Sequence, residues 1–193
     1  NVTASAVTAI TGTASALATT YGGGITGLGN ETVTVSDADV TAAHLNTINA
    51  GTSVNVVATA VTNITGSKTE LATTYGGGMT GLGNETITVS DANITSAEAN
   101  TIDGYTSGVV TATISTTDIT ALDDLTGTGN AYTITVATAD VTAAALKTVN
   151  DATTVAVTAT AVTNITGNTT DLASVYGGGI TGLGNETITV SGN

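Results

Sequence analysis

The chain repeats its own sequence, and the length of the repeat limits what it can fold into. The phrase TTYGGGITGLGNETVTV at 19–35 returns almost unchanged as TTYGGGMTGLGNETITV at 73–89 and as SVYGGGITGLGNETITV at 174–190. Shorter similar units fill the sequence between these copies, with a base length of about 22 residues and roughly ten more in some copies. A unit of this length is too short to bury a core of its own, so neighbouring units must stack.

Each unit begins with a pattern typical of a β-strand. In TITV (86–89), Ile87 and Val89 fall on one face and two threonines on the other. β-Branched residues that alternate with a period of two indicate a half-buried strand. The pattern predicts strands near residues 32–36, 54–58, 86–90, 109–114, 132–137, 155–159 and 187–191, with a partial strand at 2–4.

The second part of each unit carries the signals of a short helix. A hydroxyl or amide side chain precedes an apolar pattern with helical spacing, and an acidic residue often follows three positions later, as in a capping box. Helices of about two turns are marginal alone and depend on their neighbours. The predicted N-caps are Thr41, Ser67, Thr95 and Asn168, the last three followed by Glu70, Glu98 and Asp171.

Strands and short helices that alternate at about 22 residues per coil resemble a leucine-rich-repeat-like α/β solenoid, with about eight short parallel strands and right-handed crossovers. The composition agrees, because 40% of residues are apolar but Phe and Trp are absent, and small aliphatic side chains fill a narrow core. An all-β parallel solenoid is the alternative, which the helix caps argue against. We expect a single array over 1–193 without capping repeats, with coils at roughly 1–31, 32–53, 54–85, 86–108, 109–131, 132–154, 155–186 and 187–193.

The charge of the chain limits its partners. Fifteen acidic residues stand against Lys68 and Lys147, with no Arg, which gives a net charge of −13. This charge repels phosphate backbones, so nucleic acid is not an expected partner. Residues 1–30 are uncharged but too rich in Thr, Ser and Gly for membrane insertion.

The glycine-rich phrase could be a phosphate loop, a calcium loop or a structural turn. A phosphate loop precedes its helix, whereas YGGG follows one and lacks a GK[ST] motif. GLGNET resembles half of a calcium-binding nonapeptide, but each copy offers one carboxylate and calcium takes several oxygen ligands. We therefore favour a structural turn without a cofactor, with Gly22, Gly76 and Gly177 as left-handed helix caps. The candidate calcium ligands are Asn30, Glu31, Asn84, Glu85, Asn185 and Glu186.

Threonines on the outward face of the strands form a second candidate surface. Regular Thr-x-Thr arrays across one parallel sheet resemble ice-binding solenoids, and such a face could also bind glycans. Threonine suits any exposed strand as well, so a purely structural role competes with this interpretation. The threonine ladder is predicted from Thr32, Thr34, Thr86, Thr88, Thr111, Thr113, Thr133, Thr135, Thr187 and Thr189.

No residues point to catalysis, and we do not expect an enzyme. His44 is the single histidine, and its counterparts in other units are Glu98 and Ala145, as expected for an exposed helical position. Asp123 and Asp124 are adjacent, and adjacent residues of a helix do not face each other. Cysteine is absent, which excludes disulfides and thiolate metal sites.

Two phrases, ITALDDLTGTGNAYTITVATADVTAAALKTV and NITGSKTELATTYGGG, resemble the Thr/Ala/Val/Gly-rich tandem repeats of giant secreted and cell-surface proteins of bacteria, cyanobacteria especially. The resemblance covers essentially the whole chain and carries no catalytic residues. It implies an extracellular or cell-surface structural module of a filament, surface layer or giant protein, assembled by end-to-end stacking on copies of itself or on neighbouring repeats. The alternative is a ligand-binding or adhesive solenoid that uses calcium in the GLGNE loops or the threonine ladder.

Overall fold

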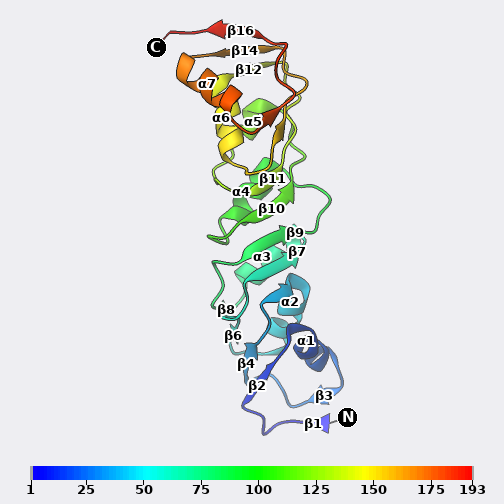
Figure 1. Cartoon of the computed structure of the whole chain (residues 1–193). Helices are drawn as coiled ribbons and strands as arrows, with labels where there is room; N and C mark the ends of the chain where they lie inside the picture. Colours follow the sequence, from blue (N-terminus) through cyan, green and yellow to red (C-terminus); the bar gives the residue numbers. More distant parts are fainter. Residues whose placement is uncertain (1, 193) are drawn as a thin grey trace. The chain divides into compact units, whose positions relative to one another are not determined.

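The computed structural model describes residues 2–192, which form many short parallel strands alternating with short helices in repeating units (Figure 1). This confirms the α/β class, and the helices contradict the all-β alternative. The residues form two compact units. Unit 1 runs up to Asp91 and includes Gly104–Gly108, whereas unit 2 comprises Ala92–Asp103 and the chain from Val109 onward. Residues 1 and 193, the ends of the first and last predicted coils, lie outside the described residues.

Unit 1 contains three helices, and α2 contacts both α1 and α3. Its elements are β1 (Val2–Thr3), β2 (Ala9–Gly12), α1 (Ala14–Gly22), β3 (Ile25–Thr26), β4 (Thr32–Val35), β5 (Asp39–Thr41), α2 (Ala42–Gly51), β6 (Val56–Val57), β7 (Asn63–Gly66), α3 (Lys68–Gly76), β8 (Met79–Thr80) and β9 (Thr86–Val89).

From α6 onward, unit 2 has the order of elements that unit 1 has from α2 onward, and α6 contacts both α5 and α7. Its elements are α4 (Ser96–Asp103), β10 (Val110–Thr113), α5 (Ile119–Leu122), β11 (Ala131–Thr133), β12 (Asp140–Thr142), α6 (Ala143–Asp151), β13 (Val157–Thr158), β14 (Asn164–Gly167), α7 (Thr169–Gly177), β15 (Ile180–Thr181) and β16 (Thr187–Val190).

The strands of unit 1 pair in a pattern that alternates between short and long repeats. A long repeat has three strands, β3, β4 and β5. Its first two strands pair with β1 and β2 of the preceding repeat, and its last two pair with β6 and β7 of the following repeat. Among the described strands β5 therefore pairs with β7 alone, and it ends its sheet. In unit 2, β12 pairs with β14 and likewise ends its sheet.

A narrow aliphatic core runs through each unit, as the composition predicts. The inward strand residues Val33, Ile64 and Ile87 are fully buried in unit 1, beside Leu45 and Leu71 from the helices. In both units the buried apolar side chains of the core are mainly Val, Ile, Leu and Ala, joined in unit 2 by Tyr132. Since aliphatic side chains are small, the core is filled by stacking equivalent residues of successive repeats.

The helix starts agree with the predicted caps. The Ser67 hydroxyl accepts the amide hydrogen of Glu70 while the Glu70 carboxylate accepts the Ser67 amide, which completes a capping box. Thr95 and Glu98 form the same pair of bonds. The other predicted caps, Thr41 and Asn168, accept the amides of His44 and Asp171.

The next repeat adds a second cap that the sequence analysis missed. The Asp37 carboxylate accepts the first helical amide of α1, from Ala14, at 2.8 Å. The Asp91 carboxylate accepts the first amide of α3, from Lys68, at 2.7 Å. A carboxylate at this end of a helix also meets the positive end of the helix dipole. Each of these two helices is thus tied to the following repeat.

The left-handed caps predicted at Gly22, Gly76 and Gly177 are wrong. These residues are the last of their helices, and among the described residues the glycines with positive φ are instead those of the GLG triplets and Gly129. The φ angles of Gly27 and Gly29 are 86° and 137°, which favour glycine on steric grounds. The backbone reversal therefore lies in the loop before the next strand rather than at the helix end.

The strand prediction found one strand of most repeats and missed the others. All eight predicted strands are present within a few residues, but β2, β3, β5, β7, β8, β12, β14 and β15 were not predicted. Five of the missed strands are short phrases such as NITG or DVT directly before a helix, and the other three are the pairs IT or MT within the glycine-rich phrase. The phrases before the helices also carry the helix cap, so they were interpreted as helix starts and the strands in them were not predicted.

The close stacking of repeats predicts which glycines are required. A Cβ on Gly66 in β7 would lie 2.6 Å from the Ala42 Cβ, so Gly66→Ala must move one repeat away from the next. We expect Gly66→Ala to lower the free energy of unfolding by about 1–3 kcal/mol. Gly76→Ala is the matched control, since a Cβ there meets nothing within 4 Å, and it should leave stability equal or slightly higher. Urea unfolding followed by circular dichroism measures both, and equal losses would contradict this packing.

Candidate functional site

The GLGNE loops, residues 27–31, 81–85 and 182–186, are the most strongly organised polar feature of the chain. In unit 1 the loop connects β3 to β4 or β8 to β9 and ends on a glutamate. Both glutamates are buried, with Glu31 1% exposed and Glu85 fully buried. A buried carboxylate is costly unless donors surround it, so its partners decide what the loop can do.

Each buried carboxylate is held by a tyrosine ten residues earlier and by the backbone of its own loop. The Tyr75 hydroxyl donates to Glu85 Oε2 at 2.7 Å, and the Gly83 amide donates to Glu85 Oε1 at 2.7 Å. The Tyr21 hydroxyl donates to Glu31 Oε1, and the Gly29 amide donates to Glu31 Oε2 at 2.7 Å. This tyrosine–glutamate clasp closes the loop back onto the helix that precedes it.

The clasp shifts the pKa values of Glu31, Tyr21 and Tyr75. Burial acts to raise the pKa of Glu31, but hydrogen bonds from the Tyr21 hydroxyl and from loop amides outweigh it, so this pKa is lowered. Burial, followed by the hydrogen bond and the charge of the partner glutamate, raises the pKa of both Tyr21 and Tyr75. At the first clasp, the folded state therefore keeps the ionised carboxylate of Glu31 beside the neutral phenol of Tyr21.

The following repeat covers the clasp in unit 1. The Tyr75 ring stacks on the Tyr105 ring with centroids 4.9 Å apart and an interplanar angle of 10°. At the first clasp the equivalent place belongs to Gly51, where a Cβ would lie 2.3 Å from the Tyr21 ring. Residue 51 is therefore small because the tyrosine occupies its side-chain space.

The third clasp, in unit 2, is open. Tyr176 is 44% exposed, and its hydroxyl lies 3.4 Å from Glu186 Oε2. Glu186 still accepts the Gly184 amide. The three copies thus have the same internal arrangement and differ in whether another repeat covers them.

The candidate calcium ligands are separated by this geometry. Glu31 and Glu85 point inward onto the clasp donors, whereas Asn30, Asn84 and Asn185 are exposed. Over residues 2–192, no three histidine or carboxylate side chains lie close enough together to hold a metal ion. A calcium ion at Glu31 or Glu85 would have to replace the tyrosine and amide donors. Calcium binding stays a prediction that this geometry does not favour.

The predicted threonine ladder is divided among sheets. In unit 1, Thr32 and Thr34 lie on β4, which pairs with β2 and β6, whereas Thr86 and Thr88 lie on β9, which pairs with β7 in another sheet. The remaining threonines lie in unit 2, with Thr111 and Thr113 on β10, Thr133 on β11, Thr135 in a single bridge to Thr158, and Thr187 and Thr189 on β16. Nine of the ten are exposed and Thr34 is half-buried, but they do not form one continuous array.

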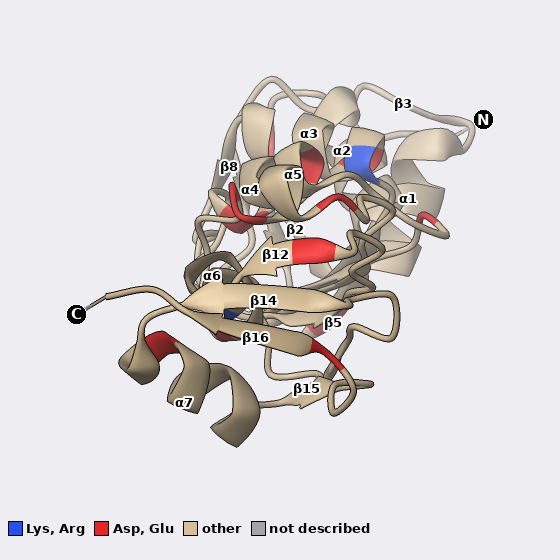
Figure 2. Ribbon diagram, turned by 90° about the horizontal axis from the view of Figure 1, so that it is seen from above, with Lys and Arg blue, Asp and Glu red and all other residues tan. Residues whose placement is uncertain are grey.

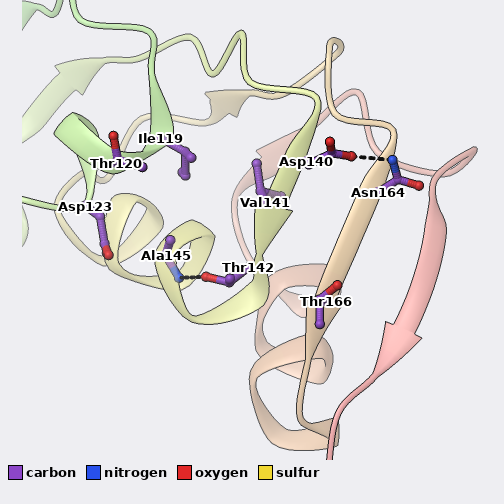
Figure 3. Close-up of a pocket in the computed structure, with 9 residues that line it drawn as sticks. All are labelled: Ile119, Thr120, Asp123, Asp140, Val141, Thr142, Ala145, Asn164 and Thr166. Atoms are coloured by element: carbon purple, nitrogen blue, oxygen red, sulfur yellow. Dashed lines mark hydrogen bonds between the residues drawn. The ribbon is translucent and has the colours of Figure 1, made fainter.

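Two grooves lie beside the edge strands β5 and β12. The groove in unit 2 has a volume of about 590 Å³ and runs between β12 and α5, where Val141 and Ile119 face each other (Figure 3). The groove in unit 1 has a volume of about 330 Å³ and includes Val40 and His44. His44 is half-buried there rather than fully exposed as the sequence suggested. The grooves occupy equivalent places, and neither was predicted from the sequence.

The acidic residues are spread along both units, for example Asp140 at the start of β12 and Asp171 in α7 (Figure 2). Lys147 forms an ion pair with Asp151 one helical turn away. Within the described residues, no helix has both the length and the apolar character that a membrane crossing requires. No protein-family model, curated protein or solved structure matches the chain.

The tyrosine of the clasp is the functional residue that sequence reasoning missed, although the sequence carries the signal. The Tyr-to-Glu spacing of ten residues occurs in every copy of the glycine phrase. The repeat that lacks YGGG also lacks the glutamate, and Tyr132 takes its place directly before the strand sequence TITV. A tyrosine and a glutamate that are present or absent together indicate a pair in contact.

Removal of one hydroxyl tests the clasp. Tyr75→Phe leaves the buried Glu85 carboxylate without one donor, so we expect the free energy of unfolding to fall by about 1–3 kcal/mol. Tyr176→Phe removes the same hydroxyl from the exposed copy and should change stability by less than about 0.5 kcal/mol. Both variants are compared with the wild type by urea unfolding. Equal effects of the two substitutions would show that the buried hydrogen bond contributes nothing.

The raised tyrosine pKa values predict a loss of stability at alkaline pH. The unfolded chain ionises its tyrosines near their ordinary pKa of 10.0, whereas folded Tyr21 and Tyr75 hold their protons to higher pH. The stabilisation is complete below pH about 10 and is lost as the pH rises through the folded pKa values. Absorbance at 295 nm should show incomplete ionisation of the five tyrosines at pH about 11 until urea unfolds the chain. Complete ionisation in the folded state would contradict the clasp.

Proposed function

We propose that the chain is a structural repeat module of a long extracellular filament, surface layer or giant cell-surface protein. Its repeats would continue end to end as a leucine-rich-repeat-like solenoid of about eight parallel strands with about 22 residues per coil. The partners are copies of itself or neighbouring repeats of the same chain. The proposal rests on one observation at strand β16.

Strand β16 exposes apolar side chains that the other copies of the same strand bury. Ile188 and Val190 are 48% and 61% exposed, whereas the equivalent pairs, Val33 with Val35 and Ile87 with Val89, are at most 8% exposed. β16 is also the last strand of its sheet and pairs with β14 alone among the described strands. An open strand edge beside exposed aliphatic side chains is a template for another strand.

The equivalent strand in unit 1 indicates what would cover β16. There β4 pairs on its far side with β6, through Thr34 and Val57. The first strand of the chain, β1, has the same place in its repeat as β6. A second repeat stacked on β16 would bury Ile188 and Val190 and cover the open clasp of Tyr176, which supports assembly by stacking.

A second candidate function is an adhesive or ligand-binding role of the exposed threonines. The supporting observation is that threonines face each other across neighbouring strands, as in the pairs Thr65–Thr88 and Thr166–Thr189. These short rows are divided among separate sheets, so they offer a smaller regular surface than one continuous ladder. Structural assembly therefore remains the leading proposal.

Charges introduced on the open strand test the assembly. The double variant Ile188→Lys/Val190→Lys places two ammonium groups where another strand would pack, and we expect it to remain monomeric. The matched control, Thr111→Lys/Thr113→Lys, adds the same charge to exposed strand positions of β10 and should assemble like the wild type. Sedimentation velocity over a wide concentration range and electron microscopy of the full chain measure the result.

The wild type should form rods or fibres whose length grows with concentration. Compact wild-type monomers at every concentration would overturn the proposal. Assembly that survives in the β16 variant would show that growth uses another surface.

A further inference from the structure

We propose that the groove beside edge strand β12, and the smaller equivalent groove beside β5, bind an extended peptide segment with basic residues. The peptide adds to the sheet as a further strand. This binding is independent of end-to-end stacking, because it uses the sides of the units and not the open strand β16.

Each groove lies beside a strand that, among the described strands, pairs on one side only. β12 pairs with β14 on one side, and the Ala139 carbonyl accepts the Asn164 amide across that pair. Successive residues of a strand direct their backbone N–H and C=O groups to opposite sides. The backbone groups of Val141 therefore point toward β14, and those of Asp140 point toward the open side. β5 has the same arrangement, with the Ala38 carbonyl bonded to the Asn63 amide. Each groove thus has an unpaired strand edge as one wall.

The side chains of the larger groove match an extended peptide. Its floor is apolar, because Ile119, Val141 and Ala145 are each at most 8% exposed (Figure 3). Its rim carries the exposed carboxylates of Asp123 and Asp140, and Asp140 also accepts a hydrogen bond from Asn164. A strand laid along β12 would place one aliphatic side chain on the floor and its neighbours at the rim. Strand addition gains affinity from backbone hydrogen bonds and specificity from such alternate side-chain sites.

Charge identifies the chemistry of the partner. The groove in unit 1 also has two carboxylates at its rim, Asp37 and Asp39. The chain itself has a net charge of −13 and only two basic residues, Lys68 and Lys147. Lysine or arginine beside the central aliphatic residue of a peptide would therefore meet negative charge in either groove.

One position on the helix wall provides a matched pair of variants. Ala145 lines the larger groove, and His44 lines the smaller one at the equivalent position of its helix. The repeat accommodates either residue, so Ala145→His narrows the groove of unit 2 with a side chain that the fold already accepts. His44→Ala makes the opposite change in unit 1.

The test uses the full chain and a fluorescent peptide, Thr-Lys-Val-Lys-Thr, with a Glu-flanked analogue, in which Glu replaces both Lys, and a Val N-methyl analogue. We expect the Lys-flanked peptide to bind, and both analogues to bind at least about tenfold more weakly, since they lose the charge attraction or a backbone hydrogen bond. Ala145→His should weaken binding by a similar factor, and His44→Ala should strengthen the second site. Fluorescence anisotropy measures affinity, and amide chemical shifts should change at Asp140–Ala145.

Each other outcome overturns the proposal. These outcomes are no binding of the Lys-flanked peptide, equal binding of the three peptides, or binding that Ala145→His leaves unchanged. Shift changes confined to Thr187–Val190 would assign the peptide to the open edge of β16 instead. Circular dichroism of Ala145→His confirms that the variant is folded, and an unfolded variant leaves the peptide analogues and His44→Ala to decide.

Discussion

The fold of each repeat depends on hydrogen bonds to the neighbouring repeats. The backbone pairs of both units join residues 23 or 24 positions apart in most repeats, and the side-chain bonds follow the same interval. The Asn46 amide, for example, donates to the Glu70 carbonyl on the next helix, and its oxygen accepts the Thr74 hydroxyl. Helices of four to ten residues have little stability alone, so these contacts hold them in place. Stability is therefore a property of neighbours in contact rather than of any single repeat.

The tyrosine–glutamate clasp shows how a long loop can be added to such a repeat. A glycine-rich insert has a high conformational entropy in the unfolded chain, and a buried carboxylate adds a desolvation cost. The tyrosine hydroxyl and the loop amides offset that cost only in one loop conformation, so they select it. Where the insert is absent, Tyr132 replaces the carboxylate, and its ring is 1% exposed. The same place in the repeat is thus filled either by a satisfied polar pair or by a large side chain.

The sequence predicted the architecture better than the site. Period-two patterns and capping residues located one strand and one helix per repeat, because these signals depend on neighbouring residues. The strands β5 and β12 were missed because their phrase DVT also caps a helix, and a local pattern does not show which strand pairs with it. Glu31 and Glu85 were considered only as candidate calcium ligands, because carboxylates are seldom buried without a partner. Their partners are tyrosines ten residues earlier, in the last turn of the preceding helix. The spacing in the sequence does not show that the loop folds back and brings the two side chains into contact.

The edge strands β5 and β12 connect the structural and binding proposals. In unit 1 the edge strand β5 follows a repeat with the glycine-rich insert, and in unit 2 the edge strand β12 follows a repeat without it. Each of the two strands is the last of its sheet, while the helix that follows it remains stacked on its neighbours. The grooves therefore depend on the strand directly before a central helix and not on the insert. A module of this kind can extend its core through stacked strands and keep unpaired edges on its sides, so assembly and peptide binding do not compete for one surface.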